Sequence, residues 1–411
     1  MSDILVIGGG AAGMMAAVFA AREGSRVTLL ERNEKLGKKV YITGKGRCNL
    51  TNDCSRDEFL SQVSRNPRFL YSALRFFSPR DMMSLLEENG CPVAVQRGKR
   101  VFPASEKASD VTRALSGLLR RLGVRIVLNA RVLCLCAEDG RLTGAQLENG
   151  AFQPADAVIL ACGGLSYPAT GSTGDGFRMA EALGHTIVPP SPVLVGLETK
   201  EDWPRSLQGL SLKNVSLTLS AGKKILYSEL GEMLFTHFGV SGPLVLEASC
   251  HLPEPPAGAQ LRIDLKPGLS GEQLDARLRR DFSAAGKKRL GSILPSLLPS
   301  SLAAAFPGLC GVPADLSCSQ VTAAQRETLV SSLKSLPLTI RAPRPLEEAI
   351  VTRGGVSVRE IEPGSLRSKL VPNLFFSGEM IDVDAHTGGF NLQIAWSTGA
   401  LAGASCGKAE G

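Results

Sequence analysis

Hydrophobic and polar positions at the start of the chain alternate in blocks rather than residue by residue. Residues 4–7 and 27–30 are short apolar runs, which are typical of parallel strands buried on both faces of a sheet. Small residues dominate residues 14–22 between them, which predicts a helix that packs closely on the strands. The order strand, helix, strand over roughly thirty residues predicts a βαβ unit.

Blocks of the same kind continue to about residue 187. Predicted strands cover residues 124–128, 131–136, 142–147 and 157–162. Predicted helices cover residues 80–89, 108–122 and 174–183. We therefore interpret residues 1–187 as an α/β domain.

The pattern changes twice after residue 187. A proline-rich stretch is followed by short alternating segments with turn signals, as in an antiparallel sheet or small barrel. Further on, helical spacing is interrupted by prolines, and then apolar runs ending in glycine pairs return. We expect a β-rich insertion at residues 188–270, a helical insertion at residues 271–335, and residues 336–411 to complete the first domain.

A glycine-rich turn joins the first predicted strand to the first helix. Gly8, Gly10 and Gly13 have the spacing of the dinucleotide-binding fingerprint, and Glu31 ends the second apolar run. These glycines permit a tight turn, close approach of a pyrophosphate and close packing of helix on strand. The helix N–H groups would face the phosphates, and the acidic side chain would accept a ribose hydroxyl. The sequence therefore predicts a dinucleotide site.

Composition restricts the class of protein. The chain has 411 residues, 44% of them hydrophobic, which is enough for two or three domains. A net charge of +7 fits an anionic cofactor or substrate and does not demand nucleic acid. The ten cysteines lack metal-ligand spacing, so we expect no metal, and their use is typical of a cytoplasmic protein. Residues 4–21 carry no charge, but they lack a basic leader and hold four glycines, so we expect neither a signal peptide nor a membrane span.

Two later glycine motifs favour a flavin over a nicotinamide. Gly378 and Glu379 follow the apolar run of a late strand. In two-part flavin folds such a pair contacts the ribityl chain and the pyrophosphate region. Gly388 and Gly389 open a helix predicted at residues 389–404, whose N-terminus carries a partial positive charge. Aimed at a flavin, that helix would stabilise the anionic reduced ring.

Longer motifs resemble one family across nearly the whole chain. They are Gly-Lys-Gly-Arg-Cys-Asn-Leu-Thr-Asn at residues 44–52, Gly-Gly-Leu-Ser-Tyr-Pro at 163–168, Thr-Gly-Ser-Thr-Gly-Asp-Gly at 170–176, Met-Leu-Phe-Thr-His-Phe-Gly-Val-Ser-Gly-Pro at 233–243, and residues 352–357 and 377–393. In these segments the chain resembles the BaiN-like (YhiN-like) FAD-dependent oxidoreductases. Two positions depart from the pattern: Lys45 replaces a usual glycine, and Ala385 stands where Asp-Val-Asp-Gly is usual. Alanine makes a left-handed backbone at that position less favourable.

The resemblance implies an α/β, Rossmann-type two-part FAD-binding domain interrupted by a β-barrel-like and a small helical insertion. It also implies that the 44–52 segment lines the FAD from ribityl chain to pyrophosphate, with Cys48 as a small packing residue, and that Val132 meets adenine through its backbone. The predicted FAD contacts are Gly8, Gly10, Ala11, Ala12, Gly13, Glu31, Arg32, Lys39, Gly46, Arg47, Cys48, Asn49, Thr51, Asn52, Val132, Gly163, Gly164, Gly378, Glu379, Gly388, Gly389, Asn391 and Leu392.

Three side chains are candidates for a catalytic proton donor. Tyr167 follows a Gly-Gly strand end, and His386 lies in the loop that enters the last helix. The plain alternative for His386 is an exposed loop residue. His237 lies in an apolar stretch of the β-rich insertion, where a lone histidine is more often a packed core residue.

We predict an FAD-dependent oxidoreductase. The resemblance implies reduction of an activated C=C bond next to a carbonyl, as in steroid- or bile-acid-type members, with a hydride added to the β-carbon and a proton to the α-carbon. Only one complete Gly-x-Gly-x-x-Gly is present, so NAD(P)H would bind transiently. The alternative enzyme is a flavin oxidase of small amines such as aminoacetone.

An alternative of another class is a flavin-bound nucleic-acid-binding protein. Residues 277–289 hold six basic residues against one acidic residue. We interpret this stretch as a solvated helix face, because few aromatic side chains lie near it to stack bases. The expected partner is a small-molecule substrate in a cleft between the FAD domain and the insertion, with neither nucleic acid nor membrane involved. The oligomeric state stays open.

Overall fold

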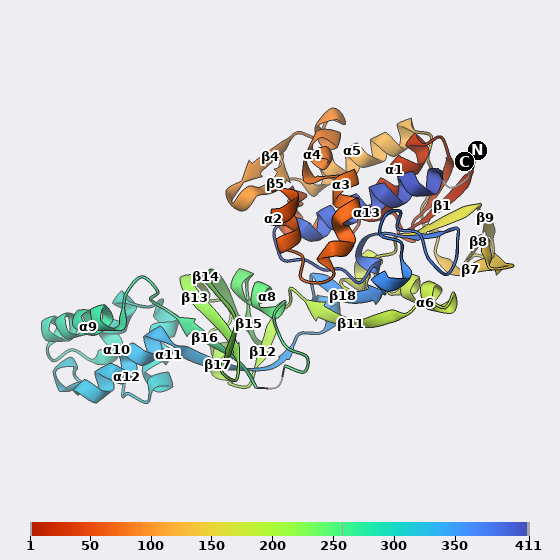
Figure 1. Ribbon diagram of the computed structural model, residues 1–411. Coiled ribbons are helices and arrows are strands. Elements are labelled where there is room, and N and C mark those ends of the chain that lie inside the picture. The colour runs from red at the N-terminus through yellow and green to blue at the C-terminus, as the bar shows by residue number, and fades with distance from the viewer. Residues whose placement is uncertain (1, 257, 409–411) are drawn as a thin grey trace. The chain divides into compact units, whose positions relative to one another are not determined.

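The computed structural model describes residues 2–256 and 258–408, and the chain divides into two compact units (Figure 1). The first unit contains Met1–Val193 and Pro345–Gly411, and the second contains Leu194–Arg344. Neither end of the first unit is dispensable for its sheet, because strands come from both segments. No helix in the described residues is long and apolar enough to cross a membrane.

A parallel five-stranded sheet forms the centre of the first unit, in the order β19-β10-β1-β2-β6. Its strands are β1 (Asp3–Ile7), β2 (Arg26–Leu30), β6 (Arg125–Val127), β10 (Ala157–Leu160) and β19 (Leu374–Phe376). Ile7 lies opposite Leu160, and Leu160 lies opposite Phe376. Because β1, β10 and β19 end in register, the glycine turns that follow these three strands meet at one edge of the sheet.

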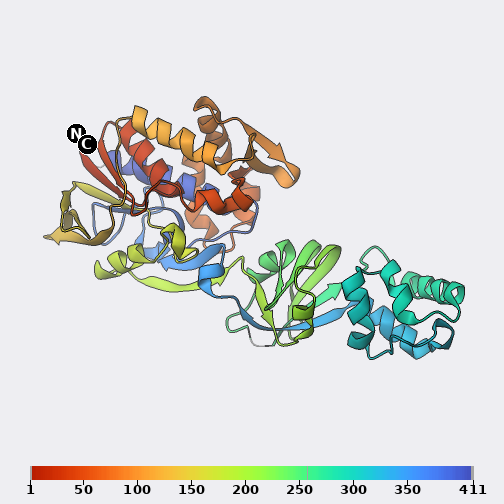
Figure 2. The same ribbon diagram turned by 180° about the vertical axis from the view of Figure 1, so that it is seen from behind.

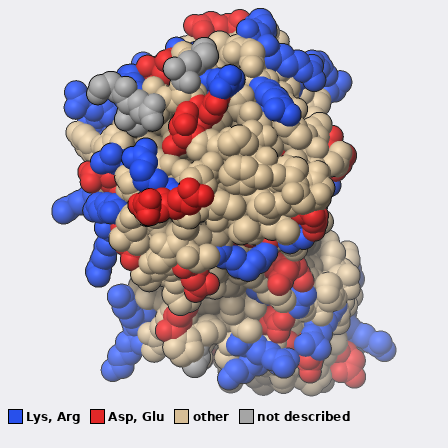
Figure 3. Space-filling view, turned by 90° about the vertical axis from the view of Figure 1, so that its right-hand side faces the viewer, with Lys and Arg blue, Asp and Glu red and all other residues tan. Residues whose placement is uncertain are grey.

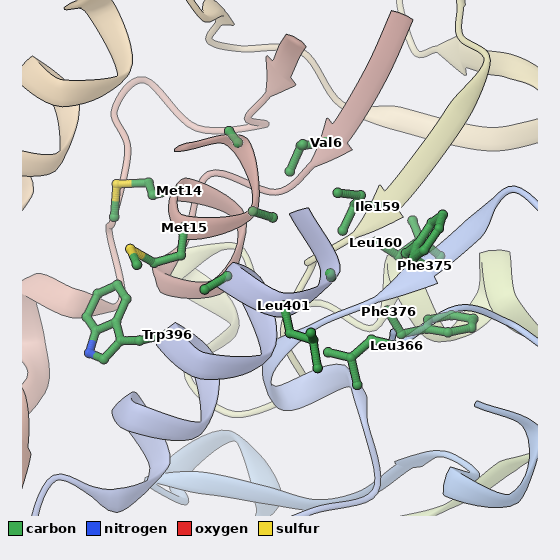
Figure 4. Packing of buried hydrophobic residues seen from close by; sticks show 14 of the residues in the cluster. Val6, Met14, Met15, Ile159, Leu160, Leu366, Phe375, Phe376, Trp396 and Leu401 are labelled. Carbon is green, nitrogen blue, oxygen red and sulfur yellow. The ribbon is translucent and has the colours of Figure 1, made fainter. Parts of the chain in front are cut away.

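Two helices, α1 (Ala11–Arg22) and α13 (Phe390–Gly407), pack against each other and against this sheet. The helix α13 is apolar on every side, and all but a few of its residues are buried, as expected for a helix inside a domain. Figure 4 shows Val6 and Ile159 of the sheet with Met14 of α1 and Trp396 of α13. Trp396 also donates its indole N–H to the Leu50 carbonyl at 3.0 Å, which ties α13 to the 44–52 segment.

The remainder of the first unit surrounds this centre. The chain segment that connects β2 to β6 contains η1 (Val40–Gly46), β3 (Thr51–Asn52), α2 (Arg56–Ser61), η2 (Pro67–Leu70), α3 (Tyr71–Phe76), α4 (Pro79–Glu88), β4 (Val93–Gln96), η3 (Arg97–Lys99), β5 (Arg100–Pro103) and α5 (Ala108–Arg121). Later come β7 (Val132–Glu138), β8 (Arg141–Leu147), β9 (Phe152–Pro154), η4 (Pro168–Thr170), α6 (Asp175–Ala182), β11 (Ile187–Val193), η7 (Leu346–Glu348), β18 (Val351–Val356), η8 (Val358–Glu360) and η9 (Gly378–Met380).

The second unit combines a closed barrel with a group of helices, seen from opposite sides in Figure 1 and Figure 2. The barrel order is β12 (Leu197–Thr199), β15 (Gly239–Ser241), β14 (Lys224–Thr236), β13 (Ser211–Ala221), β16 (Ala259–Asp264) and β17 (Leu336–Pro343). Its helices are α7 (Trp203–Ser206), α8 (Pro243–Ser249), α9 (Gly271–Ala285), α10 (Leu290–Ile293), η5 (Leu294–Ser296), α11 (Ser300–Cys310), η6 (Cys318–Gln320) and α12 (Ala323–Lys334). One continuous core joins the barrel and the helices.

The structure puts the junctions between the units a few residues later than the sequence pattern does. Residues 188–193 belong to the first unit because β11 pairs with β18. Residues 336–343 close the barrel, since β17 pairs with β12 and β16. These pairings join strands far apart in sequence, so local periodicity carries no signal for them.

Candidate functional site

The turn between β1 and α1 needs glycine for steric reasons. A Cβ on Gly8 would lie 2.5 Å from the Ala161 carbonyl oxygen, and one on Gly13 would lie 1.8 Å from the Gly8 carbonyl oxygen. A Cβ on Gly10 would meet nothing within 4 Å, so the space in front of the α1 N-terminus is open. The N–H groups of the first helical turn have no intrahelical acceptor and point toward this space. The turn therefore offers a cradle for a pyrophosphate.

Glu31, at the end of β2, is bound to the same turn. Its carboxylate accepts from the Gly9 N–H at 2.7 Å and from the backbone and side-chain N–H groups of Asn33 at 2.8 and 2.7 Å. Only 7% of the residue is exposed. Each carboxylate oxygen has two lone pairs, so Glu31 shapes the turn and keeps acceptor capacity for a ribose hydroxyl.

The helices α13 and α1 lie side by side, and α13 extends beyond the N-terminus of α1. A Cβ on Gly399 or Gly403 would come within 2.2 Å of the carbonyl oxygen of Ala12 or Ala16, respectively, so the two helices are parallel and in close contact. From this register, α13 begins about eight residues, or roughly 12 Å, before the level at which α1 begins. The N-termini of α1 and α13, each with a partial positive charge, are therefore offset along the helix axes. This arrangement suits a long cofactor with its pyrophosphate at one N-terminus and an electron-rich ring at the other.

Three asparagines hold the loop that precedes α13. Asn52 donates its side-chain amide to the carbonyls of Gly98 at 3.0 Å and Gly388 at 3.2 Å. With its amide oriented to satisfy both atoms, Asn49 accepts from the Gly389 N–H at 3.1 Å. Asn391 donates to the Ala385 carbonyl at 2.7 Å. These contacts give the asparagines a positioning role that the sequence did not reveal.

The segment 44–52 supplies further groups near that loop. The Thr51 hydroxyl oxygen is buried and has no hydrogen-bond partner among the described residues. Lys45 takes the left-handed φ of +59° that the family's usual glycine allows, whereas Ala385 is not among the described residues with positive φ. Arg47 stacks over Phe102 at 4.6 Å and pairs with Glu106 at 3.2 Å. The exposed Gly46 follows Lys45 with φ of +84°.

Lys39 and Glu379, predicted separately, form one hydrogen-bonded cluster. The Lys39 ammonium donates to Glu379 and to the Ser166 hydroxyl, both at 2.6 Å. Glu379 also accepts from the Ser166 hydroxyl at 2.9 Å and from the Thr352 N–H at 2.8 Å. Gly164 needs glycine here, because its Cβ would lie 2.4 Å from the Thr352 hydroxyl. Thr352 was missed as a site residue, and only its place in a family motif marked it.

The remaining predicted contacts lie around these groups. Arg32 is held by Asp175 at 2.9 Å and by the Thr173 hydroxyl. The Val132 side chain is buried at the start of β7, so only its backbone is available. Gly163 and Gly378 both have left-handed backbones at the common strand edge, with φ of +72°. Leu392 is half-buried in the first turn of α13.

Cysteine chemistry is not supported at this site. No disulfide joins any of the ten cysteines, all of which lie within the described residues, and Cys48 is fully buried. Burial raises the pKa of Cys48 to about 12, and burial raises that of Cys162 equally, to about 12. Thiols with such pKa values stay protonated at neutral pH and are poor nucleophiles.

The three candidate proton donors fall in different places. Tyr167 has a left-handed backbone with φ of +52° and directly follows Ser166 of the Lys39 cluster. His386 donates its backbone N–H to the Gln62 carbonyl at 2.9 Å, in the loop before α13. His237 belongs to the second unit and is exposed in the turn between β14 and β15, so the interpretation of a packed core histidine is wrong.

The parallel sheet and the glycine turns at one of its edges define a Rossmann-type dinucleotide-binding fold. The chain belongs to the HI0933-like family: the sequence model described as "HI0933-like protein Rossmann domain" matches residues 2–405. The match and the flavoenzyme relatives described next confirm the predicted family of FAD-dependent oxidoreductases and the predicted Rossmann-type fold class.

Full-length relatives carry two different names. The chain is 32% identical over 409 residues to a 3-dehydro-bile acid delta(4,6)-reductase of Clostridium scindens, covering 98% of each chain. It is 30% identical to a ribosomal RNA dihydrouridine synthase of Escherichia coli, covering 96% of each chain. It is 31% identical to the Haemophilus influenzae protein of the same name, covering 97% of this chain and 96% of the relative.

Solved structures agree in fold. A 3-ketosteroid-delta4-(5alpha)-dehydrogenase from Rhodococcus jostii RHA1 superposes with a TM-score of 0.55 at 16% identity, covering 99% of this chain and 97% of the other. At this identity the likeness concerns the fold alone.

Proposed function

We propose that this oxidoreductase reduces a C=C bond conjugated to a carbonyl. One observation carries the proposal: relatives with different names share one kind of bond. A delta(4,6)-reductase of a 3-dehydro-bile acid acts, by its name, on double bonds that extend from a 3-oxo group. A dihydrouridine synthase forms dihydrouridine, which is uridine with its C5=C6 bond, next to the C4 carbonyl, saturated. Both bonds accept a hydride at the carbon β to the carbonyl.

The residues described above fit FAD, which supplies the hydride when bound. The first turn of α1 would hold the pyrophosphate, Glu31 a ribose hydroxyl and Thr51 a hydroxyl of the ribityl chain. The α13 N-terminus would stabilise negative charge on the reduced ring, because its N–H groups and partial positive charge face that side. The Lys39 and Glu379 pair would fix the strand edge between these positions.

Protonation of the α-carbon needs a donor in this chain or a water molecule. Tyr167 and His386 are the candidates in the first unit, where the FAD residues also lie. Tyr167→Phe and His386→Gln should each be tested for slower turnover with unchanged flavin content. Wild-type turnover rates in both variants would mean that neither residue is the proton donor and that another group, such as His237, or water supplies the proton.

The decisive experiment separates the electron donor from the acceptor. Holoprotein is mixed anaerobically with NADH and, separately, with NADPH, and the visible absorbance of oxidised flavin is followed. The reduced protein is then mixed with a 3-oxo-Δ4 steroid or with a uridine-containing RNA. Matched controls are the same steroid without its double bond and the same RNA with dihydrouridine in place of uridine.

Reoxidation by an unsaturated compound and not by its saturated control would support the proposal and select the substrate. Reoxidation by oxygen alone, after reduction by a small amine such as aminoacetone, would refute it in favour of the amine oxidase. Bleaching by NADH or NADPH would identify the transient electron donor.

A further inference from the structure

Positive charge is concentrated in one segment of the first unit. Residues 35–121 contain 17 Lys and Arg against 8 Asp and Glu, whereas the remaining residues contain 29 against 31. The net charge of this segment, 17 − 8 = +9, is therefore larger than the net charge of the whole chain, which is +7. Figure 3 shows Lys and Arg side chains, interspersed with Asp and Glu, at several places around a broad uncharged area on one face of the molecule. The excess of positive charge within residues 35–121 is what a segment that binds a polyanion would carry.

The segment contains a cleft of about 500 Å³ between α2, the start of α4 and the β3–β5 sheet. We call it the basic cleft; it is lined by Asp53, Cys54, Ser55, Arg56, Glu58, Leu74, Ser78, Pro79, Arg80 and Lys99. Its two acidic groups pair with Arg80 at 3.6 Å and with Lys99 at 3.0 Å. Exposed ion pairs of this kind contribute little, so a phosphate can compete for both cations.

Arg56 differs from the other two cations of the basic cleft. No ion pair to it is found among the described residues, and its guanidinium lies over the Tyr71 ring at 4.3 Å. Tyr71 is 47% exposed and begins α3, with Arg75 exposed one turn further on the same face. Exposed aromatic rings beside arginines are what single-stranded nucleic acids stack on. Lys99, which lines the cleft on the side of the β3–β5 sheet, lies between the exposed Arg97 and Arg100 in the sequence.

Both walls of the basic cleft are attached to the loop that precedes α13. On one side, α2 packs Phe59 against Phe390 with ring centroids 5.1 Å apart. On the other side, Asn52 bridges the carbonyls of Gly98 and Gly388. The cleft is therefore next to the end of the site where the flavin ring would lie, and all of these residues belong to the first unit.

The basic stretch at residues 277–289 is a weaker candidate. Arg279 pairs with Asp275 at 2.8 Å, and Arg277 lies 3.6 Å from Asp281. Lys287, Lys288 and Arg289 are exposed there, but among the described residues no exposed large aromatic side chain lies in the helical part of the second unit. These three residues provide a matched control, because they carry the same charge as the three cations that line the basic cleft.

We propose that the basic cleft binds the sugar-phosphate backbone of a single-stranded RNA segment and directs an adjacent base toward the loop before α13. The proposal rests on the proposed function only for the chemistry done on that base. Binding itself is independent of turnover, so the two proposals can fail separately.

The test uses the FAD-loaded full chain and a short fluorescein-labelled oligouridine, with anisotropy measured over a range of salt concentrations. The triple variant Arg56→Gln, Arg80→Gln, Lys99→Gln, which removes the three cations that line the cleft, is compared with Lys287→Gln, Lys288→Gln, Arg289→Gln. We expect the first to raise Kd roughly tenfold or more and to lower the slope of log Kd against log salt by about 2, because up to three phosphate contacts are lost. The second should bind as the wild type does. Unchanged flavin absorbance in both variants shows that the fold is intact.

Three results would overturn the proposal. They are no saturable binding by the wild type, an equal loss in both triple variants, and a loss confined to the control triple. Tyr71→Ala gives an independent measure, because it removes a stacking surface and no charge. It should weaken binding with an unchanged salt slope, and wild-type affinity in this variant would contradict the placement of bases beside α3.

Discussion

Two glycine-to-alanine changes separate the cofactor cradle from the helix packing that supports it. Gly10 precedes α1 with φ of −77°, which alanine adopts without strain, and its Cβ would project into open space. Gly399 lies inside α13, and its Cβ would come 2.2 Å from the Ala12 carbonyl oxygen. The first change therefore acts on whatever occupies the space in front of α1, and the second acts on the fold.

The expected magnitudes follow from these contacts. Alanine at the N-cap costs the flavin-free protein at most about 1 kcal/mol. A methyl group where the pyrophosphate would lie should cost FAD binding at least about 1.4 kcal/mol, which is tenfold in Kd. At position 399, overpacking against backbone costs about 1–3 kcal/mol, and better helix propensity returns up to about 1 kcal/mol. Because the 2.2 Å contact is with backbone, which cannot move aside, the overpacking cost lies in the upper half of that range, about 2–3 kcal/mol. The net loss of roughly 1–2 kcal/mol corresponds to a fall in Tm of about 2–8 °C.

The assay combines thermal unfolding of the flavin-free variants with FAD titration. Gly10→Ala should lower Tm by at most about 4 °C, which corresponds to the upper limit of the cap cost, and bind FAD at least tenfold more weakly. Gly399→Ala should lower Tm. Wild-type FAD affinity in Gly10→Ala would refute the assignment of the α1 N-terminus to the pyrophosphate. A wild-type Tm in Gly399→Ala would refute the close packing of α1 on α13.

Three further predictions concern buried groups of the first unit. Arg353→Met leaves Asp384, which it contacts at 2.8 Å, as an unpaired buried carboxylate, so urea denaturation should show a loss of about 3–5 kcal/mol; a loss below about 1 kcal/mol would contradict this reasoning. Burial lowers the pKa of His185, so as the pH falls below 6.5 the unfolded chain binds a proton at this residue before the folded chain does, and the folded state loses stability. The fall in Tm below pH 6.5 should therefore be less steep in His185→Gln than in the wild type. Equal pH profiles of the two proteins would count against this reasoning. A maleimide at neutral pH should label the exposed Cys134 and leave Cys48 unmodified, which peptide mass mapping checks, and fast labelling of Cys48 would disprove its burial.

The parts of the fold that sequence predicted are those with local causes. Gly8 and Gly13 are required by contacts within one turn, and that requirement is visible as spacing. The strand ends and the last helix are marked in the same way by apolar runs that stop at glycine. The family resemblance then connected the motifs at the two ends of the chain, and this connection predicted a two-part FAD domain.

The parts that sequence did not predict depend on pairs far apart along the chain. Lys39 and Glu379 are 340 residues apart, and neither carries a signal for the other. Asn52 and Gly388 are 336 residues apart, so an asparagine that positions a loop was interpreted only as a cofactor contact. The last barrel strand was assigned to the wrong side of the junction for the same reason, because β17 finds its partners across the barrel.

Chemistry at the flavin does not by itself choose between the substrates that the relatives' names suggest, because both offer the same conjugated bond. The choice has to come from groups that contact the rest of the substrate. A bile-acid-like molecule carries at most one carboxylate and gains little from several arginines, whereas an RNA strand carries one charge per nucleotide and releases counterions at each contact. The excess of positive charge within residues 35–121 therefore favours the polyanion in this chain. Salt dependence of turnover follows directly from this difference: reduction of an RNA substrate should slow steeply as salt increases, and reduction of a neutral 3-oxo-Δ4 steroid should not.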